Sequence, residues 1–182
     1  MKALLDDLVD FNRANLGLGM SIKVGDADLG ALFADEVKQH QAAAPTHRIR
    51  FTVKGDTRGR WDGQRLQQVL RNLLSNGFAY GAKDEAVRVS LDGTAPGISF
   101  EVSNRGNPID PLKAEQLFDP LKRGGDESNH LNADGLGLGL YIVREIVRAH
   151  EGQVGVQSHE GDTVFTVHLP RASETPIPSA SE

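Results

Sequence analysis

Residues 65–80 carry two asparagines whose spacing suits a binding site beside a buried helix face. Apolar residues recur there at three- and four-residue steps, which predicts an amphipathic helix with an inner face of Leu66, Val69, Leu70, Leu73, Leu74 and Gly77. Gln68, Asn72, Asn76 and Tyr80 form a polar stripe beside that face. Asparagine within a helix costs up to about 0.7 kcal/mol relative to alanine. Either these amides bind something, or the helix lies at the surface and they only contact water.

A second polar group stands at the predicted end of a strand, in the sequence Asn104-Arg-Gly106-Asn-Pro-Ile109. An asparagine amide offers both an acceptor and a donor, which matches the ring nitrogen and exocyclic amine of adenine. Gly106 would let the backbone approach such a base closely. An ordinary polar turn is the alternative interpretation.

Three alternating glycines, Gly135, Gly137 and Gly139, run into a predicted helix. Backbone amides at such a helix N-terminus can bind phosphate. A dinucleotide-binding turn is the competing interpretation, since an acid, Glu160, follows about twenty residues later. That motif must directly follow a strand, whereas the polar residues 126–134 precede these glycines, so the sequence argues against it.

The sequence Leu117-Phe118-Asp-Pro-Leu-Lys122-Arg123 stands at the head of a polar stretch, residues 122–134, for which we expect a mobile loop. Phe118 could pack as the hinge of a lid, and the two cations could reach phosphate oxygens. Cations on a loop are more often simply solvated, so this assignment depends on its neighbours.

Alternating helices and strands are predicted to position these residues. We expect helices over about 4–13, 28–40, 65–80, 111–118 and 138–150, and strands over about 24–26, 48–53, 59–61, 87–91, 98–103, 154–157 and 164–169. Asp28 would cap the second of these helices. Short turns at 92–97 and 160–161 join two strand pairs into hairpins. The pattern predicts an α/β fold of the two-layer α+β kind, with a mixed, mainly antiparallel sheet covered by helices on one face.

Composition restricts the possible functions. The 182 residues, 38% hydrophobic and 25% charged, predict one globular domain with short appendages. A net charge of −5 without a basic cluster argues against nucleic acid as a partner. The absence of cysteine excludes disulfides and thiol nucleophiles. No apolar run approaches the ~20 residues that span a bilayer, and no signal peptide is visible. We therefore expect a cytoplasmic domain without direct membrane contact, although a membrane-bound parent protein is compatible with it.

The order Asn-x-x-x-Asn, Asn-x-Gly-x-x-Ile, Phe-x-Pro and Gly-x-Gly-x-Gly resembles the ATP-binding catalytic domain of sensor histidine kinases. These belong to the GHKL superfamily, which includes gyrase, heat-shock chaperone ATPases and MutL. The resemblance covers roughly residues 19–170 and implies a GHKL ATPase fold that binds ATP and Mg²⁺. Many members have aspartate in place of Asn104 and glycine in place of Pro108, and the variant found here resembles bacteriophytochrome-type kinases.

The resemblance also implies roles for individual residues. Asn76 would be the Mg²⁺ ligand, and Asn72 would be a catalytic residue near the phosphates and metal-bound water. Asn104 would recognise adenine and Phe118 would anchor the lid. The other nucleotide-binding residues would be Tyr80, Gly106, Ile109, Lys122, Arg123, Gly135, Gly137, Leu138 and Gly139.

Two departures from the family pattern bear on the reaction. Ala79 replaces a lysine that contacts phosphate in many members. The negative charge of the phosphates would therefore be balanced by Mg²⁺, Arg123 and Lys122. Members that hydrolyse ATP have a glutamate base four residues before the metal asparagine, whereas this chain has Asn72, whose amide cannot accept a proton at neutral pH. We therefore expect slow hydrolysis and transfer of the γ-phosphoryl group to a histidine.

None of the six histidines fits the acceptor role. The pair His150-Glu151 most resembles the expected His-Glu sequence, but Gly152 ends its helix, and His159 lies in a turn. We expect the acceptor in the dimerisation domain of a parent kinase, and a response regulator as an indirect partner. Residues 1–18 would be the end of the dimerisation helix, 19–170 the catalytic domain and 171–182 a disordered tail.

Two alternative functions remain. The missing acceptor and Ala79 allow a nucleotide-sensing or docking module without transfer activity. A free-standing ATPase or an anti-sigma-type serine kinase is the other, and Asn72 counts against the hydrolase.

Overall fold

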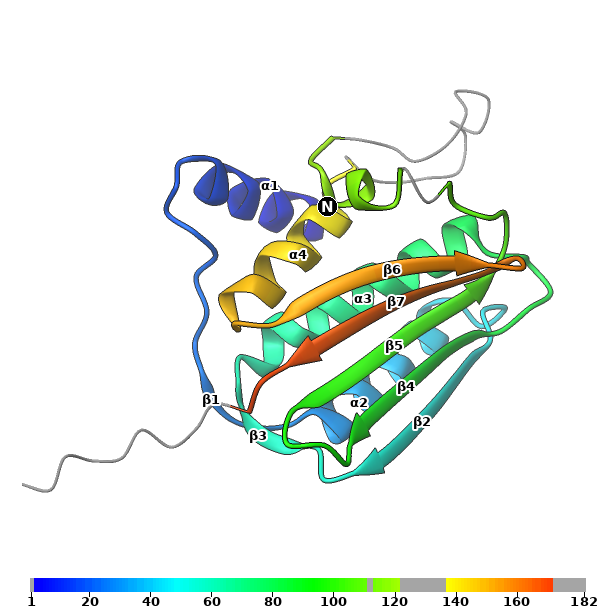
Figure 1. Cartoon of the computed structure of the whole chain (residues 1–182), viewed down its shortest axis with the longest axis horizontal. Helices are drawn as coiled ribbons and strands as arrows, with labels where there is room; N and C mark the ends of the chain where they lie inside the picture. The colour runs from blue at the N-terminus through cyan, green and yellow to red at the C-terminus, as the bar shows by residue number, and fades with distance from the viewer. Residues whose placement is uncertain (1, 111–112, 122–136, 172–182) are drawn as a thin grey trace, which may run out of the picture.

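The computed structural model describes residues 2–110, 113–121 and 137–171 (Figure 1). The helices are α1 (Lys2–Asn15), α2 (Leu29–Ala43), α3 (Gly63–Tyr80) and α4 (Gly139–Ala149), with a 3₁₀-helix η2 (Glu115–Phe118). The strands are β1 (Gly25–Asp28), β2 (Ile49–Gly55), β3 (Arg58–Trp61), β4 (Val87–Gly93), β5 (Ile98–Arg105), β6 (Gln153–His159) and β7 (Asp162–Leu169). In place of the helix expected over 111–118 there is the shorter η2, and residues 111–112 lie outside the described part.

One five-stranded sheet, in the order β2-β4-β5-β7-β6, forms one layer of the domain. Only β2 and β4 pair in parallel, and the other neighbours are antiparallel. The hairpin β6–β7 turns at Glu160 and Gly161, both of which have positive φ, as a two-residue type I′ turn requires. Helices α2, α3 and α4 cover one face of the sheet (Figure 1). The predicted mixed, mainly antiparallel sheet with helices on one face is therefore confirmed.

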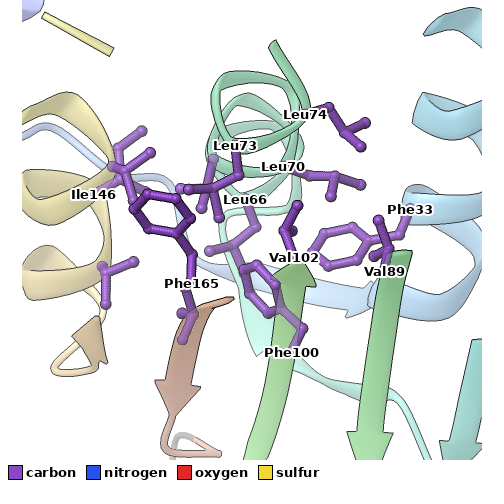
Figure 2. Close-up of a cluster of buried hydrophobic side chains, with 14 of the residues drawn as sticks. Phe33, Leu66, Leu70, Leu73, Leu74, Val89, Phe100, Val102, Ile146 and Phe165 are labelled. Carbon is purple, nitrogen blue, oxygen red and sulfur yellow. The ribbon is translucent and has the colours of Figure 1, made fainter. Parts of the chain in front are cut away.

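Helix α3 is central in the core. All five leucines and valines of its predicted inner face, from Leu66 to Leu74, are fully buried. They lie over the inward side chains of β5, Phe100 and Val102 (Figure 2). Phe33 of α2 meets Phe100 edge-on at 4.9 Å between ring centroids, while Ile146 of α4 and Phe165 of β7 close the other flank (Figure 2). This packing fixes the rotation of α3 about its axis.

Two buried carboxylates connect α3 to its neighbouring helices. Glu36 of α2, only 3% exposed, accepts two hydrogen bonds from Arg71, of 2.8 Å from Nε and 2.9 Å from Nη2. Asp10 of α1, 4% exposed, likewise accepts hydrogen bonds from Nη1 and Nη2 of Arg65. The two ion pairs orient α1 and α2 against the same helix, since a planar guanidinium fixes the geometry of each pair.

The sequence predicts that Asp28 caps α2, and the structure confirms it. Its Oδ1 accepts hydrogen bonds from the backbone of Gly30 and Ala31, and from the Thr57 hydroxyl at 2.6 Å. The Thr57 hydroxyl is also the main reason that the pKa of Asp28 lies below its usual value. The cap thereby joins the start of α2 to the turn between β2 and β3.

Leu70→Ala should lower the free energy of unfolding by about 2–5 kcal/mol, because it leaves a cavity between α3 and the sheet. Urea denaturation would measure the loss. Val53→Ala is the matched control, since Val53 is 45% exposed and its truncation should change stability by less than about 0.5 kcal/mol. Equal effects of the two substitutions would contradict the assignment of Leu70 to the core.

Candidate functional site

One residue of the polar stripe of α3, Asn72, contacts the start of α4. Asn72 and Asn76 are half-buried, and Tyr80, the last residue of α3, is 50% exposed. The Asn72 Nδ2 donates a hydrogen bond of 3.2 Å to the carbonyl of Gly139. Since Gly139 is the first residue of α4, this bond joins the asparagine helix to the end of the glycine run.

The described part of the glycine run has a special backbone conformation. Gly137 has φ +69°, a left-handed conformation that favours glycine. Leu138 is buried in the core and its carbonyl accepts the first helical hydrogen bond of α4, from Ile142. The carbonyl of Gly137 accepts a hydrogen bond from Leu121, so the chain on either side of residues 122–136 is held together. Three predicted site residues, Lys122, Arg123 and Gly135, lie outside the described residues.

Asn104 faces the helix layer at the other end of α3. Its side chain is 6% exposed and lies beside two glycines of this helix end. A Cβ built on Gly77 would lie 3.7 Å from Asn104 Cβ, and one built on Gly81 would lie 3.4 Å from Asn104 Nδ2. The two glycines therefore make room for the amide between the helix and the strand.

Backbone bonds tie the end of β5 to the end of α3. Gly81 and Gly106 form an isolated antiparallel bridge, and the amide of Ala82 donates to the carbonyl of Arg105. A Cβ on Gly106 would lie only 2.5 Å from the Tyr80 carbonyl oxygen. In this structure, the backbone of Gly106 therefore lies close to the backbone of Tyr80.

The described residues leave two cavities near these groups. The one beside Asn104 measures about 10 Å³ and is lined by Gly77, Phe78, Gly81, Ala82, Glu85, Ala86, Val87, Asn104 and Arg105. A larger one, of about 230 Å³, is lined by Ile109, Ala114, Val156, Gln157 and Ser158. Ile109 is held at its rim by a hydrogen bond from its backbone amide to the Ser158 hydroxyl. A space of about 10 Å³ holds roughly one water molecule, so a ligand that reaches Asn104 must widen it.

Phe118 occupies an anchoring position. Its side chain is 5% exposed and meets Phe165 edge-on at 6.3 Å between ring centroids. The next residue, Asp119, lies 3.7 Å from the guanidinium of Arg144 on α4. The head of the segment 122–136 is therefore fixed to the sheet by an aromatic contact and to α4 by an ion pair.

Thr163 is a buried polar residue that the sequence patterns did not single out. It pairs directly with Asn104 in the β5–β7 ladder and is 4% exposed. Its hydroxyl lies 3.4 Å from that of Ser158. The sequence signal that could have identified it is the alternation of buried residues along β7, which places the Thr163 hydroxyl on the same face as Phe165 and Val167.

His150 has a structural role. The ring is buried, its Nε2 accepts a hydrogen bond from the backbone amide of Asp62, and its Nδ1 consequently donates to the carbonyl of Ile146. Asp62 is the N-cap of α3, so this ring links the end of α4 to the start of α3. With both nitrogens engaged, the ring cannot attack a phosphoryl group.

Comparison with known proteins defines the class. Residues 61–173 match the family described as histidine kinase-, DNA gyrase B- and HSP90-like ATPase. The chain belongs to this family, and it is a histidine kinase-type ATPase domain homologous to sensor histidine kinases.

Two relatives with related sequences come from different bacteria. A bacteriophytochrome of Pseudomonas aeruginosa is 31% identical over 176 residues, which cover 96% of this chain and 24% of the relative. The sensor histidine kinase TrcS of Mycobacterium tuberculosis is 34% identical over 176 residues, which cover 93% of this chain and 34% of the relative. The chain thus spans only a quarter to a third of the length of these curated relatives.

Solved structures share the fold. The nucleotide-free catalytic domain of histidine kinase ThkA has a TM-score of 0.69 at 22% identity, covering 82% of this chain and 97% of that one. Full-length ShkA in complex with AMPPNP has a TM-score of 0.76 at 23% identity, covering 92% of this chain and 35% of that one. In the described part of the present chain, no helix combines the length and apolarity needed to cross a membrane.

Asn72→Ala should speed hydrogen exchange at the amide of Ile142, because the first turn of α4 loses its tie to α3. Removal of one hydrogen bond should also lower global stability by about 0.5–1.5 kcal/mol. Exchange followed by mass spectrometry or NMR would measure the effect. Ser75→Ala, at an exposed position of the same helix, should leave this exchange unchanged. Unaltered exchange in Asn72→Ala would show that the bond to Gly139 does not hold α4.

Proposed function

We propose that this chain is the ATP- and Mg²⁺-binding catalytic domain of a sensor histidine kinase and transfers the γ-phosphoryl group to a histidine outside the chain. The arrangement of amides along α3 carries this proposal. Asn72 contacts the first residue of α4, and Asn104 lies against Gly77 and Gly81 at the end of the helix. About 14 Å of helix axis separates residues 72 and 81, a span that an extended adenine nucleotide can bridge.

The donor groups at the two ends of α3 differ in a way that suits such a ligand. Asn104 presents an amide in a nearly dry environment, where a paired donor and acceptor discriminate well between bases. Gly137 and Gly139 lead into an eleven-residue helix, whose N-terminus favours anions. Adenine would therefore lie at Asn104, near Tyr80 and Ile109, and the phosphates would lie near Asn72 and the glycines.

Asn76 would hold Mg²⁺ through its amide oxygen. Mg²⁺ usually takes one or two protein oxygens together with phosphates and waters. We infer that the metal enters together with the nucleotide. When bound, Mg²⁺ supplies charge that stabilises the transferring phosphoryl group. Lys122 and Arg123 would add positive charge, since Ala79 provides none.

Asn72 favours transfer over hydrolysis. Its amide is a poor base at neutral pH, and its Nδ2 is already engaged with Gly139. The residue would thus position α4 and the phosphates without activating water. A nucleotide that is not hydrolysed keeps its γ-phosphoryl group for an acceptor.

The acceptor would be the phosphoacceptor domain of the parent kinase, with a response regulator as the next partner. The packing of α1 supports this assignment, because Phe11 meets Tyr141 of α4 at 5.7 Å and Asp10 is held by Arg65. Leu5, Leu8 and Val9 remain exposed on α1. A helix that contacts the catalytic domain through Asp10 and Phe11 and leaves apolar side chains exposed suits the end of a dimerisation helix.

Asn104→Ala should weaken binding of AMPPNP with Mg²⁺ by roughly tenfold to a hundredfold, since loss of a buried hydrogen-bond partner costs about 1–3 kcal/mol. Titration calorimetry would measure the affinity. Asn107→Ala is the matched control, an exposed asparagine three residues further on whose truncation should leave the affinity unchanged. Equal affinity of Asn104→Ala and the unmodified chain would remove Asn104 from the site.

Asn76→Ala should abolish phosphoryl transfer from labelled ATP to a separately purified acceptor domain of the parent kinase, and also the Mg²⁺ dependence of nucleotide binding. The physical reason is the loss of the proposed metal ligand. Autoradiography would follow transfer, with Ser75→Ala as the control that retains it. Binding without any transfer by the unmodified chain would favour a sensing module, and steady phosphate release at enzyme-like rates would favour an ATPase.

A further inference from the structure

Three aromatic rings stack where the C-terminal ends of α2 and α3 meet. His47, from the segment that follows α2, lies over Phe78 of α3 with 3.9 Å between ring centroids and 10° between planes. His40, in the last turn of α2, is 5.2 Å from Phe78 and 5.4 Å from His47. All three side chains are half-buried. The stack therefore links α2, the segment before β2 and the end of α3.

The two histidines also contact each other through nitrogen atoms. Nε2 of His40 and Nδ1 of His47 are 3.2 Å apart, a hydrogen-bond distance. Such a bond needs a proton on one nitrogen and a lone pair on the other. One additional proton can be accommodated, because an imidazolium donates to a neutral imidazole. A second proton leaves two donors and two positive charges facing each other, so the contact must break.

Burial and the neighbouring His47 make the second proton unfavourable at His40. The charge of Arg71 on α3 lowers the pKa of His40, and the charge of Glu36 on α2 raises it. These two side chains are hydrogen-bonded to one another. Burial is the main cause that lowers the pKa of His40, followed by the charge of His47.

Other charged groups near the stack belong to the segments before β2 and β4. Arg48, next to His47, donates to the backbone carbonyl of Asp84. Glu85 lines the small cavity together with Phe78. Neither group is among the charges that shift the pKa of His40.

Phe78 connects this stack to the candidate site. It follows Gly77, against which Asn104 packs, and it lines the same small cavity as Asn104 and Gly81. A ligand at Asn104 must widen this cavity while the last turn of α3 keeps its place. The stack supports that turn from the side of α2.

We propose that His40 and His47 are positioning residues, which hold the last turn of α3 in place through Phe78, and that uptake of a second proton by the pair weakens nucleotide binding at Asn104. The nucleotide part of this inference rests on the proposed function. The packing part does not, because it concerns only the described contacts of α2 and α3.

The direction of the pH effect follows from His40. Its pKa in the folded chain lies below the usual value of 6.5, which applies to the unfolded chain. At a pH between these two pKa values, the unfolded chain therefore binds more protons than the folded chain. The contribution of neutral His40 to the free energy of unfolding is therefore fully present above about pH 6.5 and is lost as the pH falls toward the folded-state pKa. Nucleotide affinity should fall over the same range.

Two variants and one control test the packing. His40→Gln and His47→Asn each keep a polar atom near the bonded nitrogen but cannot take up a proton. Urea denaturation at about pH 7.5 and about pH 5.5 should show that the folding equilibrium constant of the unmodified chain falls roughly threefold to tenfold more than that of His40→Gln. His47→Asn removes the charge of His47 but leaves His40 buried, so its pH dependence should lie between those of these two proteins. His159→Gln removes a histidine that is 85% exposed and should retain the full pH dependence. Identical pH dependence in all four proteins would overturn the proposal.

Titration with AMPPNP and Mg²⁺ at the same two pH values tests the link to the site. The unmodified chain and His159→Gln should lose roughly threefold to tenfold more affinity on acidification than His40→Gln, with His47→Asn again between them. Protonation of the nucleotide itself affects all four proteins equally and cancels in this comparison. An equal loss in every protein would overturn the coupling. Absence of binding at both pH values would refute the proposed function, while the denaturation experiment still decides whether the pair titrates as inferred.

Discussion

Burial of the apolar face of α3 against β4 and β5 is the interaction on which the candidate site depends. Because five large side chains of α3 are fully buried, the helix cannot rotate without exposing some of them to water. This fixes the direction of the neighbouring stripe, Asn72, Asn76 and Tyr80. The polar groups that would contact a ligand are therefore positioned by hydrophobic packing, and only secondarily by hydrogen bonds such as that from Asn72 to Gly139.

Small residues decide how closely the other elements approach α3. Gly77 faces Val87, where an added Cβ would lie 3.2 Å from a methyl carbon, and Gly106 faces the carbonyl of Tyr80. These contacts bring the end of β5 to the end of α3, so that Asn104 lies beside the helix that carries the other two amides. At the opposite end, Phe118 of η2 packs against Phe165 of β7, and Asp119, the next residue, pairs with Arg144 of α4. The site thus has one end built on glycine contacts and another built on an aromatic anchor and an ion pair.

The periodicity of the sequence predicts the elements well because each covers the core with one face. The helix over 65–80, the capping role of Asp28 and the turn at Glu160-Gly161 all depend on local residue types, and all are confirmed. Contacts between distant residues could not be predicted in this way. Glu36 with Arg71, Thr163 beside Asn104 and the stack of His40 with Phe78 each join elements whose relative placement is set only by the complete sheet.

The cavity beside Asn104 is small because the domain is closely packed there, and close packing also stabilises the domain. A buried amide next to glycine leaves little void, because void space forfeits packing energy. A ligand of larger volume can enter only if an element that lines the cavity moves. The His40–His47–Phe78 stack and the Glu36–Arg71 pair connect α2 and the segment after it to α3. The aliphatic core under Leu66 and Leu70 and the last turn of α3 can then keep their place while the cavity widens on the side lined by Ala82, Glu85 and Ala86, which separates the stability of the fold from the opening of the site.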